Sequence, residues 1–150
     1  MNKVYGVALS PFARKVLLAL ELKSVDYQIE TIVPYQVPES YYKIHPLGKV
    51  PAFSDDYVTL PESSVICDYI EQKYADKTPL YPRDFRETAH AKWLECYADQ
   101  HLAPVFLMFF FERFVKPKLL GGNTDENYLQ ELQQNKVPSL LDYLETQLPE

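Results

Sequence analysis

The sequence predicts an α/β domain followed by an all-helical region, and two observations lead to this fold class. Up to about residue 76, short β-branched runs and helical patterns follow the order strand, helix, strand, strand, strand, helix. Beyond residue 85, apolar residues recur only at helical spacing. Of the 150 residues, 47% are hydrophobic and 24% are charged, which is the composition of a folded globular protein.

A strand is predicted over residues 3–9, KVYGVAL, and a helix follows it. Ser10 takes the N-cap position and Pro11 the first helical position, where both residue types are favoured. Residues 26–33, DYQIETIV, alternate like a half-buried strand. A crossover through a helix implies that these two strands are parallel.

The Pro- and Tyr-rich connection that follows is predicted to hold one helical turn near Tyr41. Two strand-like pieces, PAFSD and YVTL, meet at Asp55 and Asp56 and predict a tight hairpin. The segment PESSVICDYIEQKY predicts a helix. Its apolar face is formed by Val65, Ile66, Tyr69, Ile70 and Tyr74. This order of elements is that of a thioredoxin-like domain.

We therefore predict a thioredoxin-like domain over residues 1–76, a linker over 77–85 and the start of an all-α C-terminal domain, incomplete, over 86–150. The run LAPVFLMFFF is half as long as a membrane span and predicts a buried or subunit-contact helix.

Two helices are expected in the C-terminal region. The first runs from Phe85 to Phe114 and bends at Pro104, because an interior proline removes a backbone hydrogen bond. The second covers residues 125–148, with a kink at Pro138. Its apolar stripe consists of Leu129, Leu132, Leu140, Leu141 and Leu144.

Composition also excludes several functions. With a net charge of −6 and no cluster of Lys and Arg, the chain lacks the charge pattern of a nucleic-acid-binding protein. Cys67 and Cys96 match neither a disulfide framework, nor a CxxC motif, nor a metal site. The two cysteines, outside any disulfide framework, favour a reducing, cytoplasmic location. No signal peptide or membrane span is predicted.

Three motifs carry a resemblance to a known family: SPFARK after the first strand, HPLGKVPAF before the hairpin, and LPESSVICDYIEQKY at the following helix. In this order and spacing, they make the chain resemble the cytosolic glutathione S-transferases of the serine type (theta, delta and bacterial-like classes) along its whole length. The sequence stops at Glu150, where family members continue through further helices, so we expect a truncated or unusually short C-terminal domain.

The resemblance implies a glutathione site. The bond between Val50 and Pro51 is expected to be cis, and Val50 would pair with the cysteinyl part of glutathione like an added strand. Lys49 would meet the glycine carboxylate. Glu62 would accept the γ-glutamyl ammonium, and Ser63 with the helix N-terminus would bind the γ-glutamyl carboxylate. The structural alternative is an ordinary turn at Pro51 and a helix start that Ser63 caps.

Ser10 is the expected catalytic residue. Serine-type relatives carry a serine at this place with an arginine four residues later, as Arg14 is here. The hydroxyl of Ser10 would donate to the sulfur of glutathione and stabilise its thiolate. The alternative is a plain helix cap.

An apolar site beside the sulfur is expected to hold the electrophile, because holding it there accelerates the reaction more than ionisation of the thiol alone. The candidates to line it are Phe12, Tyr97, Phe106, Phe110 and Arg113, although aromatics at helical spacing more often form a core. In some relatives, residues at the places of Asp99 and Gln100 reach the γ-glutamyl group across a dimer.

Two functions are open at this point. The first is an enzyme that conjugates the glutathione thiolate to apolar electrophiles, with glutathione as co-substrate, no metal, and a homodimeric assembly. The alternative is a non-catalytic transferase-like module that binds other proteins in stress response or translation. The sequence does not distinguish conjugation from peroxidase or isomerase activity.

Overall fold

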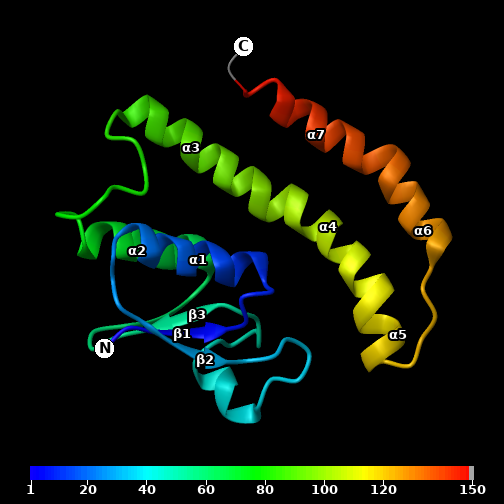
Figure 1. Ribbon diagram of the computed structural model, residues 1–150, viewed down its shortest axis with the longest axis horizontal. Coiled ribbons are helices and arrows are strands. Elements are labelled where there is room, and N and C mark those ends of the chain that lie inside the picture. The colour runs from blue at the N-terminus through cyan, green and yellow to red at the C-terminus, as the bar shows by residue number, and fades with distance from the viewer. Residues whose placement is uncertain (149–150) are drawn as a thin grey trace. The chain divides into compact units, whose positions relative to one another are not determined.

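The structure is a computed structural model that describes residues 1–148, so the last two residues of the predicted helical domain, Pro149 and Glu150, lie outside the described residues (Figure 1). The chain divides into two compact units, Met1–Ala91 (unit 1) and Lys92–Glu150 (unit 2). Among residues 1–148, no helix combines the length and the apolar character needed to cross a bilayer.

Within the described residues, unit 1 contains one four-stranded sheet in the order β2-β1-β3-β4. Its strands are β1 (Lys3–Gly6), β2 (Gln28–Thr31), β3 (Ala52–Ser54) and β4 (Thr59–Pro61). Strand β1 pairs parallel with β2 and antiparallel with β3, and β3 and β4 form the predicted antiparallel hairpin. The thioredoxin-like fold class predicted from the element order is confirmed.

Helices cover both faces of this sheet. Helices α1 (Pro11–Leu22) and α2 (Ser63–Lys73) lie on one face, and the 3₁₀ helix Glu39–Lys43, the predicted turn near Tyr41, lies on the other (Figure 1). Each face has its own core, because side chains alternate along a strand. Under α1 and α2 the buried residues are Val4, Val16, Ala19, Leu20, Val25, Phe53, Ile66, Cys67 and Ile70. Under the 3₁₀ helix they are Tyr5, Ile32, Tyr41 and Ala52.

Two predictions of burial were wrong. Residues 26–33 were expected to form a half-buried strand, but all four residues of β2 are exposed, because β2 is an edge strand. The buried residues near it, Val25 and Ile32, lie outside the strand. On α2, Val65 is 50% exposed, while Cys67 is buried with Ile66. The rest of the predicted face is confirmed, because Ile66 and Ile70 are buried and Tyr69 and Tyr74 pack against the same core.

A buried ammonium ties the end of unit 1 together. Lys23 follows α1, and its side chain is 0% exposed. Its Nζ donates to the carbonyl oxygens of Tyr74 and Thr78, both at 3.0 Å, and pairs with Glu71 at 2.8 Å. The backbone that leaves α2 is thus attached to the end of α1.

A second buried charge ties the β3–β4 hairpin to α2. The carboxylate of Asp55 accepts the N–H groups of Tyr57 and Val58, the hydroxyl of Tyr69 at 2.6 Å and the ammonium of Lys73 at 2.5 Å. Burial would raise the pKa of Asp55, but these four donors hold it well below its usual range. The tip of the hairpin is therefore fixed by charge.

Unit 2 and the residues that lead into it are helical. The first helical stretch comprises α3 (Phe85–Tyr97), α4 (Ala103–Phe110) and α5 (Lys116–Leu119), joined by π-helical segments Ala98–Leu102 and Phe111–Val115. The second comprises α6 (Glu126–Glu131) and α7 (Val137–Glu145), joined by the π-helical segment Leu132–Lys136. The first helix thus continues beyond its predicted end at Phe114.

Each π-helical segment ends just before a residue that precedes a proline. The N–H of Ala103 bonds to the carbonyl of Ala98, five residues back, and Lys116 and Val137 make the same type of bond. Pro104, Pro117 and Pro138 follow them directly. A wide turn accommodates the missing N–H and the ring of each proline. The bend expected at Pro104 and the kink expected at Pro138 are both wide turns of this kind.

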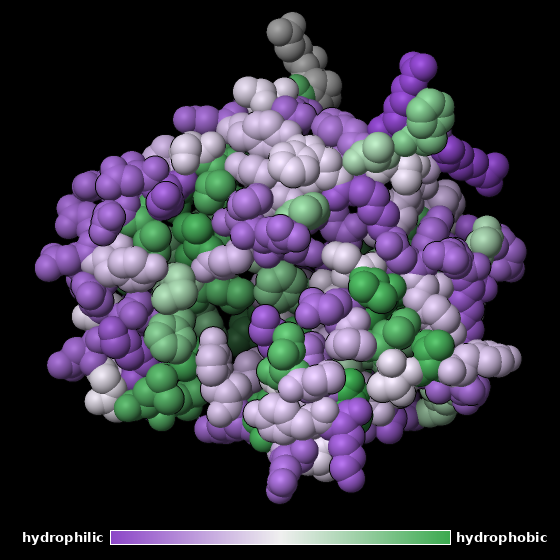
Figure 2. Space-filling model, turned by 180° about the vertical axis from the view of Figure 1, so that it is seen from behind, coloured by the Kyte–Doolittle hydropathy of each residue, from purple (hydrophilic) through white to green (hydrophobic). Residues whose placement is uncertain are grey.

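The two helical stretches of unit 2 pack antiparallel through aromatic residues. Trp93 donates its indole N–H to the hydroxyl of Tyr143, and Tyr97 donates its hydroxyl to the carbonyl of Leu140 at 3.1 Å. In the predicted leucine stripe, Leu129 and Leu132 are buried but Leu141 is exposed. The π-helical segment between them adds a residue to a turn and rotates the stripe. Apolar side chains also appear in patches on the face shown in Figure 2.

Candidate active site

Ser10 caps α1, as its sequence position predicts. Its backbone is extended, and its Oγ accepts the N–H of Ala13 at 3.3 Å. The turn before it is held by Arg14, whose Nε and terminal N–H donate to the carbonyl of Ala8 at 3.2 and 3.1 Å. A serine hydroxyl that accepts a hydrogen bond still has its own hydrogen to donate. Capping and donation to a ligand are therefore compatible.

Three separate segments meet at Gly6, the last residue of β1. A Cβ at this position would lie 3.3 Å from the Cβ of Ala13, 3.4 Å from the Cβ of Val50 and 3.9 Å from the Cα of Pro51. Gly6 also has a φ of +153°, which L side chains rarely adopt. The absence of a side chain therefore lets the start of α1 approach the segment before β3.

The bond between Val50 and Pro51 is cis, as the resemblance implies. Strand β3 begins at Ala52, so Val50 precedes the paired residues of the sheet. In the hairpin register, Ala52 stands opposite Pro61. Pro51 and Glu62, the next residues outward on the two strands, are consequently neighbours at the same end of the sheet.

Glu62, not Ser63, takes the N-cap position of α2. Its φ of 69° lies in the left-handed region that disfavours non-glycine residues, and strained backbone of this kind clusters at functional sites. Ser63 is the first helical residue and is buried. Next to it, the hydroxyl of Ser64 accepts the ammonium of Lys15 at 3.0 Å. This bond joins the N-terminal half of α1 to the first turn of α2.

Two residues of opposite charge, Lys49 and Glu62, both act on the buried His45. Burial lowers the pKa of His45, Glu62 opposes this effect and Lys49 adds to it. The Nδ1 of His45 accepts the N–H of Leu47 at 3.3 Å, which requires that nitrogen to be unprotonated. A cation and an anion at one end of the sheet suit a ligand with both charges.

Sequence reasoning missed Tyr41 as a residue that supports the site. Tyr41 is 1% exposed, and its hydroxyl donates to the carbonyl of Lys49 at 2.8 Å. Burial, and secondarily the neighbouring Tyr5, raises the pKa of Tyr41 to about 12, so its hydroxyl stays protonated. The turn near Tyr41 was predicted, but no local pattern indicates that its side chain reaches across to Lys49.

The candidates for the electrophile site fall in both units. Phe12 is half-buried on α1 in unit 1. In unit 2, Tyr97 packs against Trp93 and Tyr143 and is buried. Phe106 is 45% exposed, Phe110 stacks on Phe114 with ring centroids 5.2 Å apart, and Arg113 forms an exposed ion pair with Glu126 at 3.1 Å. Asp99 and Gln100 lie in the first π-helical segment.

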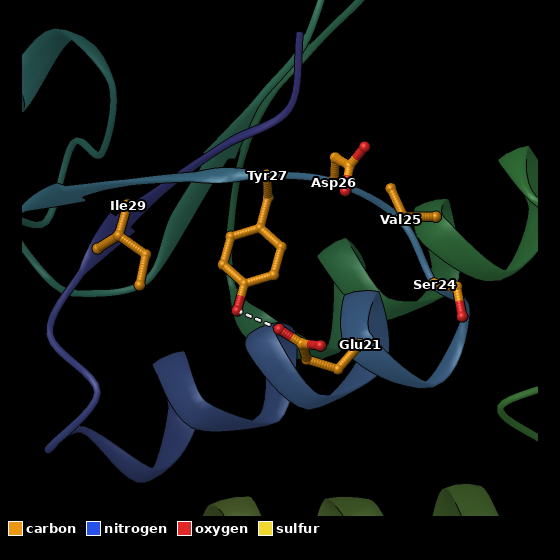
Figure 3. Close-up of a pocket in the computed structure, with 6 residues that line it drawn as sticks. All are labelled: Glu21, Ser24, Val25, Asp26, Tyr27 and Ile29. Atoms are coloured by element: carbon orange, nitrogen blue, oxygen red, sulfur yellow. Dashed lines mark hydrogen bonds between the residues drawn. The ribbon is translucent and has the colours of Figure 1, made fainter.

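An open pocket lies elsewhere on unit 1, at the end of α1 and the start of β2 (Figure 3). It is lined by Glu21, Ser24, Val25, Asp26, Tyr27 and Ile29, none of which belongs to the candidate site. Tyr27 donates its hydroxyl to Glu21 at 2.8 Å across it. Among residues 1–148, no three His, Cys, Asp or Glu side chains gather as metal ligands would.

Comparisons with known proteins agree with the fold. Residues 4–78 match the family model described as glutathione S-transferase, N-terminal domain. The chain is 33% identical to a glutathione S-transferase of Hyoscyamus muticus, over 97% of this chain and 70% of that protein. It is 32% identical to the probable glutathione S-transferase DHAR1, cytosolic, of Oryza sativa subsp. japonica, over 82% of this chain and 51% of that protein.

Among solved structures, glutathione transferase F2 from Populus trichocarpa superposes on the chain with a TM-score of 0.81. The two are 31% identical, over 97% of this chain and 69% of the poplar chain. The likeness therefore extends through both units, beyond the matched N-terminal domain.

Proposed function

The chain belongs to the glutathione S-transferase family and is a glutathione transferase, and from this premise we propose how its residues bind glutathione and activate it. Residues 1–76 form the glutathione-binding domain, 77–85 the linker and 86–150 the beginning of the helical domain. The observation that carries the proposal is that α1 and the Val50–Pro51 segment meet at Gly6, with the start of α2 beside Pro51 and bonded to α1 through Lys15 and Ser64.

Glutathione lies along the end of the sheet at Val50, with its cysteinyl main chain paired to the Val50 backbone. Lys49 attracts the glycine carboxylate. Glu62 accepts the γ-glutamyl ammonium, and the N–H groups at the start of α2, with the Ser63 hydroxyl, bind the γ-glutamyl carboxylate. The opposite charges of Lys49 and Glu62 support this direction of the tripeptide.

Ser10 is the catalytic residue. Its hydroxyl donates to the glutathione sulfur, near the positive end of the α1 dipole, and so favours the thiolate over the thiol. The thiol proton passes to solvent, and the thiolate forms a carbon–sulfur bond with an electrophilic carbon. With a chlorinated nitrobenzene, the carbon–chlorine bond breaks and chloride leaves. The Ala13 N–H, which Ser10 already accepts, fixes the oxygen in place.

The electrophile is an apolar small molecule. Phe12 is the candidate contact that unit 1 offers, and Tyr97, Phe106, Phe110 and Arg113 are the candidates in unit 2. The active form is a homodimer, which would bury aromatic residues that are exposed on the single chain, such as Trp93 and Phe114. The protein works in the cytoplasm, as the name of the rice relative states for that protein.

The test is retention on immobilised glutathione, followed by conjugation of 1-chloro-2,4-dinitrobenzene by the wild type and by Ser10→Ala. We expect the wild type to bind and turn over. Ser10→Ala should lose about 10- to 100-fold in kcat/KM, the size expected for one hydrogen bond to a charged group.

Ser10→Thr is the matched control, because it keeps both a hydroxyl and a capping oxygen, and it should retain most of the activity. A wild type that binds glutathione without turnover would instead support the non-catalytic module. Equal activity of the wild type and Ser10→Ala would remove Ser10 from the mechanism.

A further inference from the structure

Tyr41 belongs to none of the three motifs, yet it is the largest fully buried side chain of unit 1. It lies in the 3₁₀ helix Glu39–Lys43, on the face of the sheet opposite α1 and α2. Its ring is fixed by neighbours, with the centroids of Tyr5 and His45 at 6.2 and 6.3 Å. Its carbonyl accepts the N–H groups of Ile44 and His45 at 2.8 and 2.9 Å.

The hydroxyl of Tyr41 controls one peptide plane. It donates at 2.8 Å to the carbonyl oxygen of Lys49, and that carbonyl and the N–H of Val50 belong to the same peptide group. The group is planar, and in a trans peptide the oxygen and the hydrogen point in opposite directions. Holding the oxygen of Lys49 on the Tyr41 side therefore aims the Val50 N–H away from the 3₁₀ helix.

The rest of this segment is fixed by its own turn. The N–H of Gly48 donates to the carbonyl of His45 at 2.9 Å, and the φ of Gly48 is +61°. A Cβ at Gly48 would come within 2.8 Å of the Tyr42 ring. With the turn closed before Gly48 and the sheet beginning at Ala52, the Lys49–Val50 peptide lies between two fixed points, and Tyr41 sets its rotation.

We infer that Tyr41 is a positioning residue for glutathione, whose hydroxyl, through the Lys49 carbonyl, directs the Val50 N–H to the cysteinyl main chain of the tripeptide. This inference rests on the proposed function, in which Val50 pairs with glutathione. Tyr41 acts on binding of the backbone of the ligand, whereas Ser10 acts on its sulfur.

The test measures binding of S-methylglutathione, whose blocked sulfur removes thiolate formation, by calorimetry with the wild type, Tyr41→Phe and Tyr74→Phe. We expect Tyr41→Phe to raise the Kd about five- to tenfold, as for one lost hydrogen bond. The KM for glutathione should rise equally, with kcat within about twofold of wild type. Tyr74→Phe is the matched control, because it removes a hydroxyl that donates to Asn2 at 3.1 Å, and its Kd should not change.

Circular dichroism establishes the temperature at which each variant is folded, and binding is measured there. An unchanged Kd for folded Tyr41→Phe overturns the inference and leaves the proposed function intact. A wild type that binds neither glutathione nor S-methylglutathione overturns both.

The second variant is Val50→Pro, which lacks the N–H but keeps the Tyr41 hydroxyl. It should bind at least as weakly as Tyr41→Phe, and wild-type affinity would overturn the inference.

Discussion

Unit 1 and unit 2 differ in how their elements are held together. Among residues 1–148, the buried apolar side chains of unit 2 are Tyr97, Val115, Leu129 and Leu132, and all others lie in unit 1. Both units contain buried charges with several partners, Lys23 and Asp55 in unit 1 and Glu112 in unit 2, so it is the apolar core that distinguishes them. The proposed glutathione residues thus sit in the densely packed unit, and most electrophile candidates sit in the sparsely packed one.

The largest expected effect is a loss of folding stability that is confined to unit 1. Asp55→Ala leaves Lys73, Tyr69 and two backbone N–H groups without their acceptor, so the free energy of unfolding of unit 1 should fall by about 3 kcal/mol. Trp93 is the one tryptophan of the sequence and lies in unit 2, so its fluorescence reports on that unit. When unfolding in urea is followed by the loss of glutathione binding, its midpoint should move to lower urea, whereas the midpoint followed by Trp93 fluorescence should not move. A shift of both midpoints would show that the units unfold together.

The second prediction separates the cap from the catalytic role inside unit 1. Ser10→Asp retains an acceptor for the Ala13 N–H, so stability should stay within about 0.5 kcal/mol of wild type. A carboxylate cannot donate to the thiolate and repels it, so kcat/KM should fall at least as much as the 10- to 100-fold expected for Ser10→Ala. Loss of stability equal to that of an alanine variant would contradict the shared role of this oxygen.

A smaller effect is expected from unit 2. Tyr143→Phe removes the acceptor of the Trp93 indole N–H and should lower the free energy of unfolding of unit 2 by about 1 kcal/mol. The fluorescence transition should move to lower urea, with the affinity for glutathione unchanged. If glutathione affinity falls as well, the two units are more closely coupled than their separate cores indicate.

The smallest effect concerns pH. Burial lowers the pKa of His45 below 6.5, so the unfolded chain takes up a proton at a higher pH than the folded chain. The stability that the neutral ring contributes is therefore present above pH 6.5 and is lost as the pH falls toward the folded pKa. Unit 1 should be less stable at about pH 5.5 than at about pH 7.5. His45→Asn, which keeps an acceptor for Leu47 but does not titrate in this range, should reduce that difference.

The element order of unit 1 was predictable because its signals are local. Ser10 and Pro11 mark a helix start by their own chemistry, and the hairpin is marked by two strand-like pieces around Asp55. The candidate glutathione residues were predicted from motifs. Their meeting point depends on Gly6, and the need for a glycine there becomes clear only when α1 and the segment before β3 are placed together.

The parts that could not be predicted depend on distant contacts or on helix phase. The bond from Tyr41 to Lys49 spans eight residues and depends on the fold of the 3₁₀ helix. The predicted helical stripe of the C-terminal region was wrong at Leu141, which is exposed, because a fixed helical period does not include the wide turns before prolines. The exposure of β2 depends on its place at the edge of the sheet, which no residue within it indicates.

The ammonium of Lys23 has a consequence for limited proteolysis. It holds the carbonyls of Tyr74 and Thr78, and Glu71 at the same anchor also accepts the N–H of Leu80. A protease needs a stretch of backbone that can leave its hydrogen bonds, and this stretch resists until the anchor opens. Cleavage between the units should therefore begin after Leu80, and the released N-terminal fragment should keep its tether and its ligand.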